Sequence, residues 1–188
     1  MATIAAIFKR ELRSYFATPI GYVFIVVFLV LCAYATFETG GFFEARQASL
    51  RAFFRYFPYI YLVVIPAISM RLWSEELSRG TVELLFTLPV KMSHAILGKF
   101  LAAWAFFGIA LALTFPMVVT VNRLGDPDPG PIIAGYLGAF LMAGMYLAIC
   151  LFCSAMCKNQ VISFIAGFIV CVLFVLAGLP ESVEFFAG

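Results

Sequence analysis

Charged residues are scarce in this chain. Asp, Glu, Lys and Arg together make up 12% of its 188 residues, whereas hydrophobic residues make up 64%. A soluble domain has about 25% charged and about 45–50% apolar residues. An ordinary soluble core does not account for this excess, and with a mean hydropathy of +1.06 the sequence predicts a membrane protein. The net charge of +2 is too small to indicate a nucleic-acid partner.

Groups that commonly carry catalysis are also few. The single histidine, His94, has no nucleophile or orienting partner near it in the sequence, so we expect no catalytic residue. Gly98 and Lys99 resemble the end of a phosphate-binding loop, but Phe100 follows where Ser or Thr belongs, and Ser93 replaces the first glycine. The chain therefore has no nucleotide site of its own, and an ATP-driven system would hold ATP and Mg²⁺ in a partner chain.

Metal-binding patterns are missing as well. The five cysteines lie in or at the ends of apolar runs, which does not indicate a secreted disulfide framework. Cys150, Cys153 and Cys157 share one helical face, but their spacing lacks the second ligand pair of a zinc site. Asp126 and Asp128 are too few for a calcium cage. We predict no metal site and no cofactor in this chain.

Long apolar runs separated by short polar segments predict five membrane-crossing helices. About 20 apolar residues cross a hydrocarbon layer of ~30 Å. Pro58 and Pro66 predict kinks in the second helix, and Pro116 predicts a bend in the third. The expected spans cover residues 20–37, 53–70, 97–121, 132–156 and 161–179. Together with their loops they form one transmembrane domain, 20–188, of an all-α polytopic membrane protein.

Residues 1–19 predict an amphipathic helix ahead of the first span. Lys9, Arg10 and Arg13 fall on one face, and aliphatic and aromatic residues fall on the other. A basic face opposite an apolar face is typical of a helix that lies in the membrane interface. Pro19 ends this helix. We expect an interfacial elbow that turns the chain into the first span, and the alternative is a surface helix without a special role.

The basic residues predict the orientation in the membrane. The chain has twelve Lys and Arg residues, and more of them fall on one side than on the other. One side holds Lys9, Arg10, Arg13, Arg71, Arg79, Lys91, Lys99 and Lys158. The other side holds Arg46, Arg51, Arg55 and Arg123. The positive-inside rule places the first set in the cytoplasm, so the N-terminus and residues 71–99 are expected there.

The middle of the expected first, third, fourth and fifth spans carries no ionisable residue. Ion channels and proton-coupled carriers usually retain such residues, because charge inside a bilayer is costly and is kept for use. The sequence therefore disfavours both of these classes.

Residues 71–99 form the longest polar interruption. Trp73 is expected at the membrane interface, where Trp is enriched. Residues 81–88 predict a short amphipathic helix that Pro89 ends, with Val82, Leu85 and Phe86 on one side. Anchors at such spacing are typical of a helix that docks in a groove of a partner protein. A helix lying flat on the bilayer is the alternative.

The run MRLWSEELSRGTVELLFTLPV, with LGKF soon after it, resembles the permease subunits of ABC-2-type transporters. The segments FKRELRSYFATPIGYVFIVVFLVL, GDPDPGPIIAGYLG and KNQVISFIAGF are similar to the branch of that family named for gliding motility. The resemblance covers nearly the whole chain. Its most specific part is the spacing of Glu76, Gly80, Thr81, Glu83, Leu84, Leu85, Thr87 and Pro89.

The resemblance implies a non-catalytic permease subunit of an ATP-driven exporter in the bacterial inner membrane, with the type V exporter fold. That fold has a sixth span, which we do not find in this sequence. The implied partners are an ABC ATPase, a second permease copy or homologue, and the bilayer, with a periplasmic accessory protein as a further candidate. The alternative is a scaffold or anchor subunit of a gliding-type envelope machine without translocation activity.

The resemblance also implies that residues 71–99 couple the spans to the ATPase. The residues expected to make that contact are Glu75, Glu76, Arg79, Gly80, Thr81, Val82, Glu83, Leu85, Phe86 and Pro89.

Overall fold

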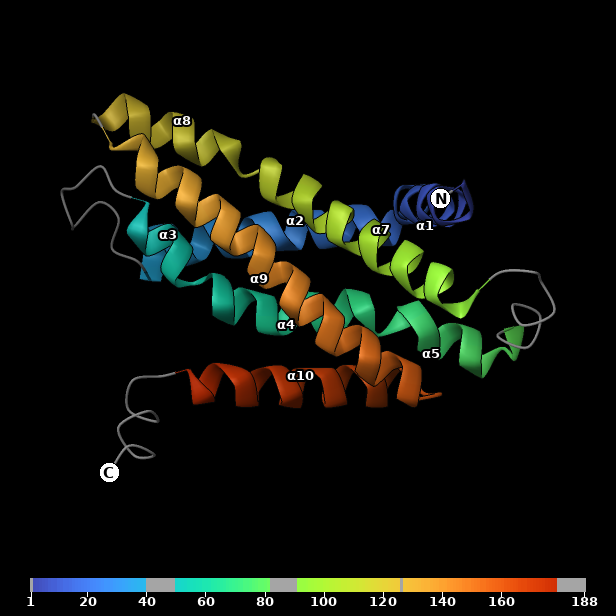
Figure 1. Cartoon of the computed structure of the whole chain (residues 1–188). Helices are drawn as coiled ribbons and strands as arrows, with labels where there is room; N and C mark the ends of the chain where they lie inside the picture. Colours follow the sequence, from blue (N-terminus) through green and yellow to red (C-terminus); the bar gives the residue numbers. More distant parts are fainter. Residues whose placement is uncertain (1, 40–49, 82–90, 126, 179–188) are drawn as a thin grey trace.

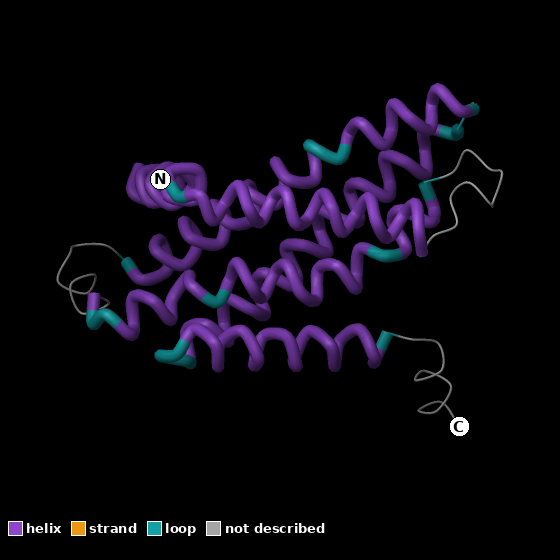
Figure 2. Tube along the Cα trace, turned by 180° about the vertical axis from the view of Figure 1, so that it is seen from behind, coloured by secondary structure: helices purple, strands orange, loops and turns teal. Residues whose placement is uncertain are grey.

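The computed structural model describes residues 2–39, 50–81, 91–125 and 127–178. Within these ranges the chain is helical and contains no strand (Figure 2), which confirms the predicted all-α class. The helices are α1 (Ala2–Ala17), α2 (Pro19–Tyr34) with a π-helical turn (Ala35–Thr39), α3 (Arg51–Arg55), α4 (Phe57–Ser69), α5 (Arg71–Ser78), α7 (Met92–Ala112), α8 (Phe115–Leu124), α9 (Pro129–Met156) and α10 (Gln160–Ala177).

Five helical segments of the described chain are long and apolar enough to cross a membrane. They cover Pro19–Phe37, Phe57–Ser78, Met92–Leu124, Pro129–Met156 and Gln160–Ala177. Two of them reach into the segment 71–99, which the sequence predicted to be a loop. Because α5 continues α4 across Met70 and α7 begins at Met92, most of that polar segment that the structure describes is helical.

Local chemistry explains where the helices begin. Thr18 is extended, with φ −106° and ψ 142°, and Pro19 opens α2 in the first turn, where its missing N–H is tolerated. The Asp128 carboxylate accepts a hydrogen bond from the amide two residues later (3.0 Å) and caps α9. Asn159 caps α10 in the same way (2.8 Å). These caps satisfy N–H groups that the first turn of a helix leaves unpaired.

The third membrane-length segment is interrupted rather than smoothly bent. Residues 113 and 114 separate α7 from α8, and Pro116 falls in the first turn of α8. The Thr114 hydroxyl donates to the Leu111 carbonyl oxygen (2.7 Å) and lies 2.9 Å from the Tyr136 hydroxyl of α9. The predicted bend is therefore a helix break that starts ahead of Pro116, and neutral hydroxyl groups bond to it.

Helix α9 is central and packs against α4, α5, α7 and α10 (Figure 1). Small residues on its buried face allow close approach. A Cβ on Gly144 would come within 3.1 Å of the Trp104 indole nitrogen of α7. The Trp104 ring stacks on Phe140 of α9, with centroids 4.4 Å apart, and its indole N–H donates to the Phe140 carbonyl oxygen (2.9 Å). Small and flat side chains thus set the spacing between α7 and α9.

Helix α1 runs at a steep angle to the long helices, because Figure 1 views it end-on and views α7, α9 and α10 from the side. It packs chiefly on α7. A Cβ on Gly98 of α7 would press against the Ile7 side chain at 2.7 Å, and a Cβ on Gly21 of α2 would collide with the Tyr15 carbonyl oxygen. Glycine at these two positions lets α1 lie against both helices. Its place in a membrane interface stays a prediction.

Candidate functional site

Lys99 is the one charged residue that lies fully buried in the described part of the chain, with 3% of its surface exposed. It stands in the second turn of α7. Its ammonium donates to Glu76 Oε1 (2.7 Å) and to the Leu72 carbonyl oxygen (2.9 Å), and both acceptors belong to α5. A buried charge is costly unless it is paired and hydrogen-bonded. These contacts therefore join α7 to α5.

The same ammonium also meets α1. Glu11 Oε1 lies 3.7 Å from Lys99 Nζ and accepts a hydrogen bond from Arg10 (2.6 Å). On the α5 side, the centroid of the Trp73 ring is 5.2 Å from Lys99 Nζ, which is within cation–π range. We call Lys99, Glu76, Glu11 and Trp73 the Lys99 cluster. One positive charge, carried by α7, therefore contacts two other helices, α5 and α1.

A second, more exposed group of charges lies along α5. Glu75 Oε2 pairs with Arg71 Nε at 3.1 Å, and Glu75 Oε1 pairs with an Nη of Arg79 at 2.7 Å. Both pairs have the four-residue spacing that brings side chains together on a helix. Exposed pairs of this kind contribute about 0–1 kcal/mol each. They support α5 locally, whereas the Lys99 cluster connects α5 to other helices.

Ser154 of α9 forms hydrogen bonds with backbone groups at the junction between α4 and α5. Its Oγ accepts hydrogen bonds from the backbone N–H groups of Trp73 (3.1 Å) and Ser74 (3.2 Å) and donates to the Met70 carbonyl oxygen (3.2 Å). The Ser74 hydroxyl donates to the same carbonyl oxygen. The first N–H groups of a helix have no partner within it. Ser154 thus acts for α5 as a cap that another helix supplies.

Gly80 ends α5. Its φ of +68° lies in the left-handed region that favours glycine and is common just after a helix. The Arg79 amide donates to the Glu75 carbonyl oxygen (3.1 Å), and the Thr81 hydroxyl donates to the Glu76 carbonyl oxygen (3.3 Å). Gly80 and Thr81, which the resemblance singled out, therefore terminate α5 ahead of the segment that follows.

The predicted contact residues that the structure describes differ in the groups that they contact. Glu75 pairs with Arg71 and Arg79 along α5, and Gly80 and Thr81 follow the end of that helix. The Glu76 carboxylate instead accepts a hydrogen bond from Lys99 of α7. Its second oxygen, Oε2, is buried and has no hydrogen-bond partner among the described residues. The other predicted contact residues lie outside the described residues: Val82, Glu83, Leu85, Phe86 and Pro89.

The residues predicted for the membrane interface differ in how exposed they are. Lys9, Arg10 and Arg13 are exposed on α1, as an interfacial helix requires. Trp73 was predicted at the membrane interface, which stays a prediction, and only 3% of its surface is exposed. Its ring packs inside the bundle against Lys99, because α5 continues α4 and carries Trp73 into the contact with α7 and α9.

Sequence reasoning missed Lys99, Glu11 and Ser154 as members of this site. The signal for Lys99 was present, since a lysine beside Gly98 begins an apolar run and was assigned to the loop. Its partner Glu76 lies 23 positions away, and Ser154 lies 81 positions from Trp73. Single-helix periodicity does not reveal pairs at such separations.

The site offers fixed charges rather than a reactive group. Among the residues that the structure covers, no three His, Cys, Asp or Glu side chains gather where they could hold a metal ion. Tyr15 of α1 stacks on Phe106 of α7, with centroids 4.8 Å apart. Burial raises the pKa of its phenol well above the usual value, and the Glu11 carboxylate raises that pKa further. The charges and aromatic rings of this arrangement therefore join α1, α5 and α7.

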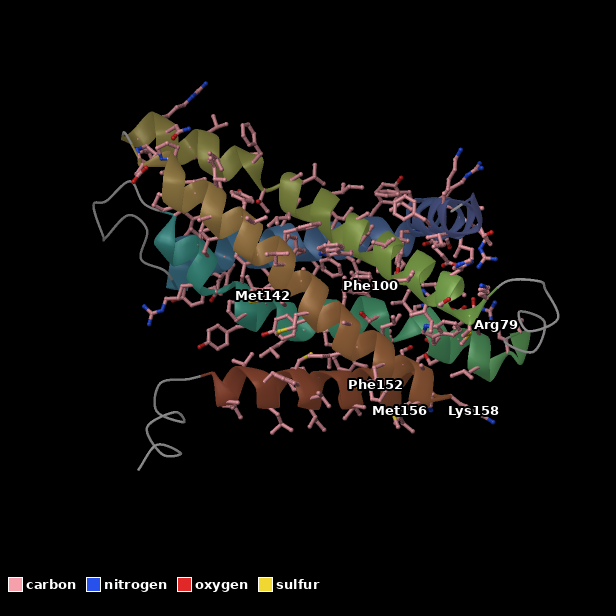
Figure 3. All side chains as sticks on the ribbon, viewed as in Figure 1. Arg79, Phe100, Met142, Phe152, Met156 and Lys158 are labelled. Atoms are coloured by element: carbon pink, nitrogen blue, oxygen red, sulfur yellow. The ribbon has the colours of Figure 1, made fainter. Side chains whose placement is uncertain are left out.

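Basic residues of separate segments lie at the end of the bundle that holds the Lys99 cluster. Figure 3 shows Arg79 of α5 and Lys158 of the α9–α10 turn at the same end, with Met142 of α9 well away from it. Helix α1, with its three exposed basic residues, lies at that end too (Figure 1). Basic residues that the sequence assigned to one side of the membrane therefore lie at one end of the bundle, and their cytoplasmic placement stays a prediction.

A family model described as "ABC-2 family transporter protein" matches residues 33–184. The matched range includes α4, α5, α7 and α9 and begins after α1. A search of curated proteins and a search of solved structures found no match.

Proposed function

The chain belongs to the ABC-2 transporter family, and from that premise we propose that it is the permease subunit of an ATP-driven exporter whose ATPase is a separate chain. Membership in this family makes the chain a multi-pass membrane subunit of the permease type. The narrower placement in the gliding-motility branch, the direction of transport and the pairing with a second permease copy are part of the proposal.

We propose that residues 71–99 dock on the ATPase and pass its movement to the spans. The Lys99 cluster is the observation that carries this proposal. It ties α5, which precedes residues 79–91, to α7, which follows them, and it holds both against α1. A force applied to the segment between α5 and α7 would then act on two membrane-length helices together, because packed helices shift as units.

The end of the bundle that holds the Lys99 cluster and the predicted docking segment is called the docking end. It is proposed to face the cytoplasm of a bacterial inner membrane, with the N-terminus on the same side. The exposed basic residues of α1, together with Arg79 and Lys158, gather at this end, and cytoplasmic loops carry an excess of Lys and Arg. A periplasmic accessory protein would then contact the opposite end, near α3 and α8.

The proposal is tested by reconstituting the chain in vesicles with and without the ATPase that co-purifies with it. The chain alone should hydrolyse no ATP, and the complex should hydrolyse ATP and move substrate. Glu83→Ala and Phe86→Ala should lower transport per ATP hydrolysed, because they alter the predicted docking segment. Lys158→Gln, which changes an exposed charge at the same end, is the matched control.

Two results would count against the proposal. Normal coupling in both loop variants would remove the role of residues 71–99. ATPase binding without transport of any substrate would instead support a scaffold or anchor subunit, since such a subunit needs the docking segment but no translocation path.

A further inference from the structure

A cavity of about 590 Å³ lies beside the Lys99 cluster, between α1, the start of α2, the α4–α5 junction and α7. This volume falls within the range of about 300–1,000 Å³ that is typical of small-molecule sites. One wall is apolar and includes Ile20 and Phe24 of α2 and Ile68 of α4. The other wall is charged, with these residues: Arg10, Glu11, Arg71, Glu75, Glu76, Arg79 and Lys99. The cavity is therefore amphipathic.

The charged wall has one positive charge in excess, because it carries four basic residues and three carboxylates. Each of the three carboxylates already has a cationic partner. Both oxygens of Glu75 pair with arginines, and Glu11 Oε1 and Glu76 Oε1 pair with Lys99. The guanidinium groups can donate further hydrogen bonds. Arg71 uses only Nε and Arg79 uses only one Nη in these pairs, whereas a guanidinium has five N–H donors.

We propose that this cavity binds a glycerophospholipid whose headgroup carries a net charge of −1. Arg71 and Arg79 bind the phosphate, since planar guanidinium groups suit phosphate oxygens. The start of an acyl chain lies along Ile20 and Phe24. The excess of one positive charge matches a single phosphodiester.

The apolar wall explains why the ligand is a lipid rather than a soluble anion. Ile20 and Phe24 stand in the first turns of α2, a membrane-length helix. Val27 and Leu31 continue the helical face of Ile20 and Phe24 further along α2, and 43% of Val27 is exposed. An acyl chain that leaves the cavity along α2 therefore meets a continuous apolar surface.

The buried carboxylate explains the preference for a headgroup without an amine. An ammonium group needs an accessible carboxylate oxygen, but Glu75 offers none that is unpaired. Glu76 Oε2 has no partner among the described residues, yet it is buried out of reach of solvent. Lys99, through its 2.7 Å contact with Glu76, holds that carboxylate in place. The cavity thus favours an anionic headgroup over a zwitterionic one.

The test measures lipid binding to the full chain in detergent by native mass spectrometry, with phosphatidylglycerol and phosphatidylethanolamine of matched acyl chains. Phosphatidylglycerol should bind about tenfold more tightly. Arg79→Gln should weaken its binding about tenfold, because a charge-assisted contact is lost. The Arg79 side chain is 69% exposed, so this change should leave the fold intact. Arg13→Gln, on an exposed arginine of α1 that does not line the cavity, should bind like the unchanged protein.

A second variant changes the shape of the cavity and leaves its charge unaltered. Ser14 lines the cavity, and Ser14→Trp should exclude the lipid. Ser78→Trp, at an exposed position outside the cavity, is its control. Equal phosphatidylglycerol binding by Arg79→Gln and Arg13→Gln, or by the two tryptophan variants, would overturn the proposal. Equal binding of the two lipids, or displacement of the lipid by the same concentration of inorganic phosphate, would overturn it as well. None of these results depends on the ATPase, so they are distinct from a failure of the coupling proposal.

Discussion

The two ends of this helical bundle are held together by different chemistry. At one end, the buried ammonium of Lys99 contacts α1 and α5 from α7, and its closest partner is Glu76 at 2.7 Å. At the other end, the break between α7 and α8 is bonded by neutral groups, with the Thr114 and Tyr136 hydroxyls 2.9 Å apart. The first arrangement joins helices through charge. The second supplies neutral hydrogen bonds where the helix is interrupted.

This difference indicates which end is built to stay rigid. Removing one partner of a buried ion pair costs about 3–5 kcal/mol, because the other charge is left uncompensated. Losing a neutral hydrogen bond costs about 0.5–1.5 kcal/mol. The end that carries the proposed docking segment is therefore the one in which the helices are hardest to separate. Substitutions at each end test this difference.

The largest effect is expected for Lys99→Met. It leaves Glu76 without its cation, and the free energy of unfolding should fall by about 3–5 kcal/mol. Unfolding of the full chain in mixed micelles of increasing SDS content measures this change. Lys158→Met, at an exposed position at the same end, should unfold like the original protein. If the two variants unfold alike, the Lys99 cluster does not hold this end together.

The double variant Lys99→Met with Glu76→Met isolates the pair itself. A buried ion pair that is replaced by apolar side chains of similar size is often neutral for stability. The double variant should therefore be more stable than Lys99→Met alone. A double variant whose loss equals the sum of both single losses would show that the two side chains act independently.

An intermediate effect is expected for Ser154→Ala. This change leaves the Trp73 and Ser74 amides without the acceptor from α9, and unsatisfied buried donors cost about 1–3 kcal/mol. Ser163→Ala is the matched control, because Ser163 is also buried but its hydroxyl has no partner among the described residues. The control should be neutral or slightly stabilising in the same SDS titration. Equal losses would assign the effect to packing rather than to capping of α5.

The sequence predicted the class of fold and the number of membrane-length helices because both depend on local composition. The low charge content and the long apolar runs are properties of neighbouring residues. Helix α1 ends just before Pro19, as expected, because proline restricts the backbone of the residues next to it. The same local reasoning placed Trp73 at the membrane interface, but it could not show that the Trp73 ring is buried against Lys99 of α7.

The site was less predictable because tertiary contacts define it. The polar sequence from 71 to 78 indicated a loop, yet α5 is helical, since Ser154 of α9 satisfies its first amides. Lys99 was assigned to the same loop, whereas its partners come from two other helices. Gly80 was singled out from a motif as a contact residue, which stays a prediction, and its positive φ shows that it also follows the end of α5.

The smallest effect is expected at the neutral end, for Tyr136→Phe. This change removes one hydroxyl that contacts Thr114, and the Thr114 hydroxyl keeps its bond to the Leu111 carbonyl oxygen, so the loss should be about 1 kcal/mol. Tyr34→Phe, on a residue that is 62% exposed, is the control for removing a tyrosine hydroxyl. A loss as large as that of Lys99→Met would mean that both ends are equally fixed. The docking end would then be no more rigid than the opposite end, and the Lys99 cluster would no longer support the proposal that the docking end transmits movement.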